Sequence, residues 1–280
     1  MSQTPSFASP ATGRPFIKMH GLRNHFVIVD ARIDDYAPSV EEVVRICDPK
    51  TGVGADQLIV IEPSLSVDAF MRIINVDGRE VEACGNATRC VAWLLLEESA
   101  LDRVVLETIA GHIACTRSGE REVSCEMGRV SMDWQMIPLS REVDTCHVDY
   151  TAGPLSDGIA LNVGNPHIVF FVDDINAIDI ESLAPGIQQD PLFPEQVNVG
   201  IAELLAADHL RSKVYERAAG LTTACGSGAC VAAYAALARG LTDHRRIKVS
   251  MPAGDVMIDI DDDGVATMTG PVEYCFSGFL

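Results

Sequence analysis

Two cysteines stand in near-copies of one segment, at 83–86 and 224–227. Each segment contains Ala-Cys-Gly followed by Asn or Ser, and an apolar run with helical spacing comes next. Cys84 and Cys225 are 225 − 84 = 141 residues apart, about half of the 280-residue chain. Two thiols that face each other across a pseudo-two-fold axis would form an acid–base pair, in which one thiolate takes a proton from carbon while the opposite thiol delivers another. Such a pair can invert a stereocentre without a cofactor.

The same offset brings other polar residues of the two halves into register. The matched pairs are Asn24 with Asn165, Gln57 with Asn198, Asn75 with Glu216, and Gly85 with Gly226. Chance rarely keeps one register across positions that are spread over half a chain. The sequence therefore predicts a duplicated unit, and each copy contributes one cysteine on a glycine turn that leads into a helix.

A helix start beside each cysteine would serve this chemistry in two ways. Its unpaired N–H donors carry partial positive charge, which lowers the pKa of a nearby thiol and can hold a carboxylate. With an ordinary thiol pKa near ~8.5, forming the thiolate at neutral pH costs about 2 kcal/mol, and a helix start is worth roughly 0.3–2 kcal/mol. The same donors would stabilise an enolate-like carbanion. The sequence has no P-loop, no G-x-G-x-x-G and no obvious cofactor-binding lysine, which fits a mechanism without a cofactor.

The remaining cysteines have the ordinary role of a free thiol, which packs as a small apolar side chain. Cys90 and Cys230 lie inside the helical runs that follow the two motifs. No supporting motif surrounds Cys47, Cys115, Cys125, Cys146 or Cys275. We expect all of them in the core.

The charge balance bears on the class of partner. The chain has 21 basic and 40 acidic side chains, a formal net charge of −19. Without a basic cluster to offset it, such a surface repels nucleic acid and anionic membrane. Residues 1–15 show no secretory signal, and no apolar run approaches the roughly 18 residues that span a bilayer. Because C-x-x-C pairs and Cys/His ligand spacing are absent, the nine cysteines are most simply reduced thiols, and we expect a cytoplasmic protein.

Short strands surround one long helix in each half. The first half has strand patterns at 16–19, 26–29, 58–62, 70–75, 104–108, 112–116 and 122–127, and the second at 168–172, 197–202, 212–217, 246–251, 255–260 and 265–269. Helical spacing covers 86–98, with Asn86 as the N-cap, and 228–239, with Ser227 as the N-cap. These patterns predict the α+β class, with two pseudo-symmetric domains from an internal duplication, each a mixed or antiparallel sheet around a central helix.

The duplication also divides the chain. Residues 1–15 are rich in Ser, Thr and Pro and are expected to be a disordered lead-in. An N-terminal domain is expected at 16–126, completed by 269–280, and a C-terminal domain at 127–268.

Several motifs of this chain resemble those of the diaminopimelate epimerase family. They are KMHGLxN at 18–24, GVGADQ at 52–57, NxDGxEVxxCGNAxRC at 75–90, GNPH at 164–167, FPExxN at 193–198, YER at 215–217, ACGSGAC at 224–230 and MTG at 268–270. Their order and spacing agree as well as their residue types, and the resemblance extends from Phe16 to Leu280. It implies interconversion of LL- and meso-2,6-diaminopimelate, in the synthesis of lysine and of a peptidoglycan precursor, by a reduced Cys84/Cys225 pair. It also implies that no pyridoxal phosphate and no metal take part, that two domains close over the substrate, and that the protein is a homodimer.

The resemblance further assigns the polar groups of the site. Those that would hold the substrate's polar groups are Asn24, Asn75, Asn165, Asn198, Glu216 and Arg217, with Gln57 in the same pocket motif. Gly85, Asn86, Gly226 and Ser227 would hold the reacting carboxylate at the two helix starts, and His167 would orient a catalytic partner. The guanidinium of Arg217 suits a carboxylate because it can donate two parallel N–H bonds, one to each oxygen.

Five positions depart from the family pattern. His25 stands where Asp is usual, Arg23 where Gly is common, Arg79 in place of Ser, Ala218 in place of Gly, and Leu221 in place of Glu. None of them removes a proposed acid, base or carboxylate ligand, so they bear on fine specificity and rate.

Two other functions remain open at this point. A related cofactor-independent racemase acting on proline, hydroxyproline or another amino acid would share the thiol pair but would not need Arg217 and the asparagine set. A thiol redox protein would use the two cysteines as a switchable disulfide, and it would need none of these substrate ligands.

Overall fold

The computed structural model describes residues 13–99, 101–217 and 219–280. Most of the predicted lead-in, and Ala218 among the departures from the family pattern, lie outside the described residues. Within the described part, the chain is dominated by strands, and hydrogen bonds link 18 of them into one continuous sheet. The predicted α+β class is confirmed.

The order of elements repeats between the halves. The first half contains β1 (Pro15–Gly21), β2 (Asn24–Asp30), α1 (Val40–Cys47), β3 (Gln57–Glu62), β4 (Ala69–Asn75), β5 (Glu80–Val81), α2 (Gly85–Ser99), β6 (Arg103–Thr108), β7 (Gly111–Gly119) and β8 (Glu122–Arg129). The second half contains β9 (Val148–Ala152), β10 (Leu155–Asn162), β11 (Pro166–Phe171), α3 (Ile180–Gln188), β12 (Asn198–Ala206), β13 (His209–Glu216), β14 (Gly220–Thr222), α4 (Gly226–Ala238), β15 (Arg246–Met251), β16 (Gly254–Ile260), β17 (Val265–Pro271) and β18 (Glu273–Phe279).

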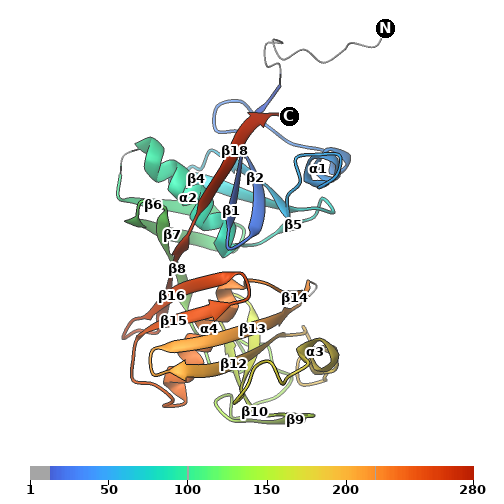
Figure 1. Cartoon of the computed structure of the whole chain (residues 1–280), viewed down its shortest axis with the longest axis vertical. Helices are drawn as coiled ribbons and strands as arrows, with labels where there is room; N and C mark the ends of the chain where they lie inside the picture. Colours follow the sequence, from blue (N-terminus) through green and yellow to red (C-terminus); the bar gives the residue numbers. More distant parts are fainter. Residues whose placement is uncertain (1–12, 100, 218) are drawn as a thin grey trace.

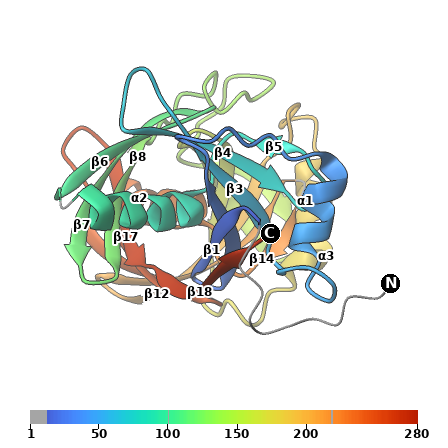
Figure 2. The same cartoon turned by 90° about the horizontal axis from the view of Figure 1, so that it is seen from above.

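Each half wraps its strands around one central helix, and the two halves are stacked along the long axis of the molecule (Figure 1). Helix α2 packs against β1, β2, β6, β7 and β8, and in the view from above it extends between β7 and β1 (Figure 2). Helix α4 packs against β10–β13 and β15–β17. The shorter helices α1 and α3 lie at the side of their respective halves (Figure 1).

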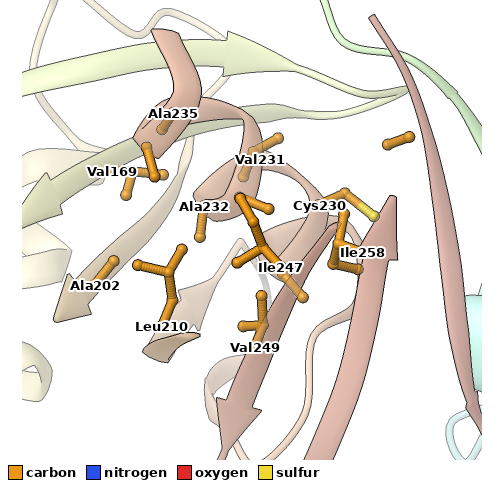
Figure 3. Close-up of a cluster of buried hydrophobic side chains, with 14 of the residues drawn as sticks. Val169, Ala202, Leu210, Cys230, Val231, Ala232, Ala235, Ile247, Val249 and Ile258 are labelled. Carbon is orange, nitrogen blue, oxygen red and sulfur yellow. The ribbon is translucent and has the colours of Figure 1, made fainter. Parts of the chain in front are cut away.

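The composition of α4 explains how strands can enclose it. The helix is rich in alanine, which has the highest helix propensity and the smallest side chain that still packs. Ala232 and Ala235 face Leu210, Ile247 and other buried side chains of the surrounding strands (Figure 3). Small side chains on the helix let branched side chains of the sheet approach it closely.

The register of the strands confirms the duplication. Parallel β2 and β3 place Phe26 opposite Gln57, and parallel β11 and β12 place His167 opposite Asn198. The second pair is the first pair moved by 141 residues, since 26 + 141 = 167 and 57 + 141 = 198. The offset that the sequence predicted therefore relates whole ladders of hydrogen bonds as well as single residues.

The two long helices occur where they were predicted, but both predicted caps are wrong. The Thr88 N–H donates to the Cys84 carbonyl at 2.9 Å, so α2 begins on Cys84, and Asn86 lies inside its first turn. Cys225 is the N-cap of α4, and Ser227 again lies inside the helix. The cysteines themselves occupy the positions that Asn and Ser usually favour.

Two further helices were not expected. Helix α1 is only eight residues long, and α3 contains Pro185, which argues against a helix in a sequence pattern. Among the described helices, none combines the length and the apolar character needed to cross a membrane.

The cysteines are all free, and most of them are buried as expected. The core prediction is confirmed for Cys47, Cys90, Cys115, Cys125 and Cys230. It is wrong for Cys275, which is exposed, and Cys146 is only half-buried. Cys275 lies on β18, which pairs only with β1 among the described strands, so one of its edges has no neighbouring strand.

Two strand pairings connect the halves. Antiparallel β8 and β17 run side by side between them, with Met268 opposite Cys125. The chain then returns through β18, which pairs with β1 in the first half (Figure 1). We keep the division into 16–126 with 269–280 and 127–268 as a proposal, which this return of β18 supports.

The core around α4 makes a stability prediction. Replacing Ile247 with Ala removes a fully buried side chain that packs on α4, and the cavity should lower the free energy of unfolding by about 2–5 kcal/mol. Urea unfolding measures this difference. The matched control is Ile33→Ala at a fully exposed isoleucine, which should change the free energy by roughly 0.5 kcal/mol or less. Equal effects of the two substitutions would contradict the assignment of this core.

Candidate active site

The starts of α2 and α4 converge on two methionines. A Cβ atom placed on Gly85 would lie 2.9 Å from Met268 Cε and 3.0 Å from Met127 Cε. A Cβ atom on Gly226 would lie 3.1 Å from the same Met268 Cε. Both glycines therefore leave room for the methionine side chains, and the two helix starts lie on either side of them. The helices also contact one another directly.

Three polar side chains form a hydrogen-bonded group around Cys84. The Cys84 thiol donates to Asn24 Oδ1 at 3.6 Å, and Asn86 Nδ2 approaches the same oxygen at 3.4 Å. Asn24 Nδ2 donates to Asp56 Oδ2 at 3.1 Å. Because a carboxylate only accepts hydrogen bonds, Asp56 determines which end of the Asn24 amide faces Cys84.

A different group surrounds Cys225. Its sulfur lies 3.5 Å from Ser227 Oγ, which in turn lies 3.1 Å from His167 Nε2. Asn165 Nδ2 donates to Ser227 Oγ at 3.3 Å. His167 Nε2 is also 3.1 Å from Asn165 Oδ1 and 3.4 Å from Asn198 Nδ2. The structure thus places Asn165 and Asn198 around the His167 imidazole, close to the Cys225 thiol.

His167 is a neutral imidazole in this environment. It is fully buried, and burial lowers its pKa to about 3, with a smaller contribution from the positive charge of Arg217. Its Nδ1 atom has no hydrogen-bond partner among the described residues. A neutral ring can orient Ser227 and the asparagines through Nε2 without adding charge to the site.

Glu216 and Arg217 stand at the end of β13. The Glu216 carboxylate accepts a hydrogen bond from Thr222 Oγ1 at 2.6 Å, and its charge raises the pKa of both Cys84 and Cys225. The Arg217 backbone N–H donates to Asn198 Oδ1 at 2.7 Å, and its guanidinium donates to the Glu195 carbonyl.

Gln57 and Asn75 form the matching pair in the first half. They lie opposite each other on β3 and β4, and Gln57 Nε2 donates to Asn75 Oδ1 at 2.9 Å. The Gln57 Oε1 atom is buried and has no donor among the described residues. A buried amide oxygen without a partner is costly, and an ammonium group of a ligand would satisfy it.

Burial reverses the expected effect of the helix starts on the thiols. It raises the pKa of Cys84 to about 11, although the backbone amides of Ala87 and Asn86 lower it. Burial and Glu216 also raise the pKa of Cys225, against the amide of Gly228 and the hydroxyl of Ser227. The expectation that the helix starts would lower the pKa of the two thiols is therefore wrong. Ionising Cys84 at neutral pH would cost about 5 kcal/mol.

The departures from the family pattern leave the described contacts in place. His25 donates its backbone N–H to Asp56 Oδ2 at 2.7 Å, a bond that almost any residue supplies. Arg23 is exposed in a left-handed conformation with φ 60°, and Arg79 pairs with Asp77. Leu221 is exposed on β14. None of these side chains contacts either cysteine.

Sequence reasoning missed five side chains of this region: Asp56, Arg89, Met127, Thr222 and Met268. Asp56, Arg89 and Met268 lie inside the quoted motifs, so the signal was present but had no assigned role. Met127 and Thr222 become visible only once strands far apart in the sequence are placed together.

Both halves of the chain match a known protein family. The family model described as diaminopimelate epimerase matches residues 16–133 and 159–275, and each matched segment contains one of the two cysteine motifs. The chain belongs to the diaminopimelate epimerase family. It is 45% identical to the diaminopimelate epimerase of Rhodospirillum centenum, over 95% of this chain and 92% of the relative. It is 48% identical to the diaminopimelate epimerase of Erythrobacter litoralis, over 94% of this chain and 96% of that relative.

Solved structures share the fold at low sequence identity. A hydroxyproline epimerase from Agrobacterium vitis with bound trans-4-hydroxy-L-proline superposes with a TM-score of 0.67 at 14% identity, covering 95% of this chain and 90% of the other. A phenazine biosynthesis protein of the PhzF family from Enterococcus faecalis gives a TM-score of 0.67 at 11% identity, covering 96% and 99%. These likenesses show the fold, which several chemistries share.

The raised pKa of Cys84 has a direct test. In the folded, reduced, full-length protein, the rate of Cys84 alkylation by iodoacetamide should keep rising with pH up to about pH 11, because only the thiolate reacts. In the protein unfolded in urea, the same rate should level off near a pH of ~8.5. Peptide mass spectrometry follows Cys84 by itself. Identical profiles in the folded and unfolded protein would contradict the raised pKa of Cys84.

Proposed function

We propose that this chain interconverts LL- and meso-2,6-diaminopimelate through proton transfer by Cys84 and Cys225. The observation that supports this most is the placement of the two thiols. Each begins a helix, and the first glycines of the two helices pack against the same methionines. The chain is also 45% identical, over nearly its whole length, to a curated diaminopimelate epimerase. An isomerase of this family acts on a small molecule.

The backbone amides at the two helix starts are the proposed holders of the reacting carboxylate. Gly85 and Asn86 supply them from α2, and Gly226 and Ser227 supply them from α4. These N–H groups have no partner within the helix, and they carry partial positive charge. They would stabilise the negative charge that spreads onto the carboxylate as the α-proton leaves.

The substrate's ammonium group would make the thiols easier to ionise. Burial and the negative charge of Glu216 both raise the pKa of Cys84. A bound ammonium would offset Glu216 and could also donate to the unpaired Gln57 Oε1. One thiolate then takes the α-proton, and the opposite thiol gives its proton to the other face of the same carbon.

The remaining polar residues are proposed as the binding groups for the substrate. Asn24, Asn75, Asn165 and Asn198 would bind its polar groups, and Arg217 its second carboxylate. His167 would orient Ser227 beside Cys225, because its Nε2 contacts that hydroxyl. The reaction as proposed uses neither a cofactor nor a metal.

Two further properties belong to the proposal. A second copy of the chain would pair at β18, whose free edge carries the exposed aromatic side chains Tyr274, Phe276 and Phe279. Sedimentation equilibrium would distinguish this homodimer from a monomer.

Free cysteines at every position fit the reducing conditions of the cytoplasm. The net charge of −19 disfavours nucleic acid and anionic membrane as partners.

The decisive experiment is proton exchange in D2O. Reduced protein should exchange the α-proton of LL-diaminopimelate for deuterium and form the meso isomer, as followed by NMR. Cys84→Ala and Cys225→Ala should abolish the epimerisation, since each removes one of the two proton-transfer groups. Cys146→Ala is the matched control and should retain it, because Cys146 lies outside the proposed site.

Other outcomes would change the assignment. Full turnover in either active-site variant would refute the two-thiol mechanism. Exchange with proline or hydroxyproline, but not with diaminopimelate, would assign the protein to a related racemase activity. No exchange with any amino acid would favour a thiol redox protein.

Arg217 makes a separate prediction about substrate binding. Arg217→Lys should raise KM by about 10–100-fold, because an ammonium cannot bind both oxygens of a carboxylate as a guanidinium does. The matched control is Arg121→Lys, at a half-exposed ion pair with Glu273, which should leave KM unchanged. An unaltered KM in Arg217→Lys would remove this residue from the substrate site.

A further inference from the structure

A fully buried cation lies beside the site, and the proposed mechanism does not use it. Arg89 stands in the second turn of α2 and is the largest of the fully buried side chains. Its Nη2 donates to Asn86 Oδ1 at 2.8 Å, and its Nη1 lies 3.5 Å from the Gly85 carbonyl and 3.4 Å from Met268 Sδ. Its Nε has no partner, and no described carboxylate forms an ion pair with it. A buried charge without a counter-charge is among the costliest features a protein can keep.

The surrounding strands are built to hold this cation. A Cβ atom on Gly21 of β1 would lie 3.2 Å from Arg89 Nη2, and one on Gly270 of β17 would lie 3.2 Å from Arg89 Nε. Glycines on two strands therefore leave space on either side of the guanidinium. The fold accommodates the charge at this position instead of letting the long side chain reach solvent.

The cation also breaks the duplication. The residue equivalent to Arg89 in the second half is Cys230, since 89 + 141 = 230, and it packs in the apolar core of α4. One helix start therefore has a fixed positive charge within its first turns, and the other has a thiol in the same place. The two otherwise matched sites differ in charge at this position.

The charged groups around the two thiols differ accordingly. Glu216 raises the pKa of both Cys84 and Cys225. The amides of Ala87 and Asn86 lower the pKa of Cys84, and the positive charge of Arg89 lowers it further. At Cys225 the neutral groups Ser227 and Gly228 provide the opposing effect. Burial is the largest influence at both sulfurs, and these neighbours add to or oppose it.

We propose that Arg89 is a positioning residue whose fixed positive charge makes Cys84, and not Cys225, the thiol that loses its proton first. The inference rests on the proposed function only in taking these two cysteines as the reacting pair. Arg89 acts through its neighbours as well. Because a guanidinium only donates, it binds Asn86 Oδ1 and leaves Asn86 Nδ2 directed toward Asn24, beside the Cys84 sulfur.

The test compares the ionisation of both thiols in one folded protein without substrate. Full-length, reduced protein is alkylated with iodoacetamide over a series of pH values, and peptide mass spectrometry gives a separate profile for Cys84 and Cys225. The midpoint of each profile is compared, and not the rate, because the two sulfurs differ in exposure. In the unaltered protein, the Cys84 midpoint should lie below that of Cys225.

Two substitutions at Arg89 separate the effect of its charge on the Cys84 midpoint from the effect of its packing. Arg89→Met removes the charge and should raise the Cys84 midpoint by about one pH unit, a roughly tenfold slower reaction at any pH below it. Arg89→Lys keeps a cation and should leave the Cys84 midpoint near its original value. The Cys225 midpoint should stay the same in both variants. Circular dichroism confirms that each variant is folded.

Several results would overturn the proposal. A Cys225 midpoint at or below that of Cys84 in the unaltered protein refutes it, even if Arg89→Met does not fold. Equal shifts in Arg89→Met and Arg89→Lys would assign the effect to packing and not to charge. No step of this test needs catalytic turnover. An active epimerase whose Cys225 ionises first would therefore refute the role of Arg89 and leave the proposed function standing.

Discussion

The enclosure of two helix starts within a sheet is the constraint on which the other features of this molecule depend. Strands surround α2 and α4, so the N–H groups at their first turns cannot turn to water and need polar neighbours inside the protein. Cys84 and Cys225 occupy the N-cap position of each helix, where a side chain meets these groups. Asparagine, serine and histidine side chains fill the space around the two sulfurs. The polar residues of the candidate site are therefore also the groups that a buried helix start requires.

The same enclosure keeps the two thiols protonated. Desolvation outweighs the helix amides at both sulfurs, and Glu216 adds to it. A thiol held in its neutral form is a weak nucleophile and is slow to oxidise or to react with electrophiles. In a protein whose nine cysteines are all free, this protects the pair from oxidation. In the proposed mechanism, the positive charge of the substrate's ammonium group favours the thiolate, and the proposed role of Arg89 is to favour it at Cys84 first.

Features that follow from periodicity and repetition could be predicted from the sequence, and those that follow from distant contacts could not. The offset of 141 residues predicted that Asn24 matches Asn165 and that Gln57 matches Asn198, and the parallel strand pairs of the two halves follow the same offset. The caps were misplaced by two residues because Asn and Ser are the usual caps, and a cysteine in that position is unusual. The predicted direction of the shift in the thiol pKa was wrong, because the depth at which the thiols are buried depends on how the strands assemble. The contacts of Asp56 and of Arg89 arise where separate strands meet.

The return of β18 to the first half affects the order in which the molecule can be assembled. Pro15 pairs with Phe279, so the sheet of the first half contains neighbours that are 279 − 15 = 264 residues apart. During synthesis, β1 leaves the ribosome early but has no partner on this side until nearly the whole second half has followed. Contacts between such distant segments form slowly because a long loop must close first. The sheet of the first half is therefore completed only with the second half, and neither Cys84 nor Cys225 acquires its complete surroundings on a partly made chain.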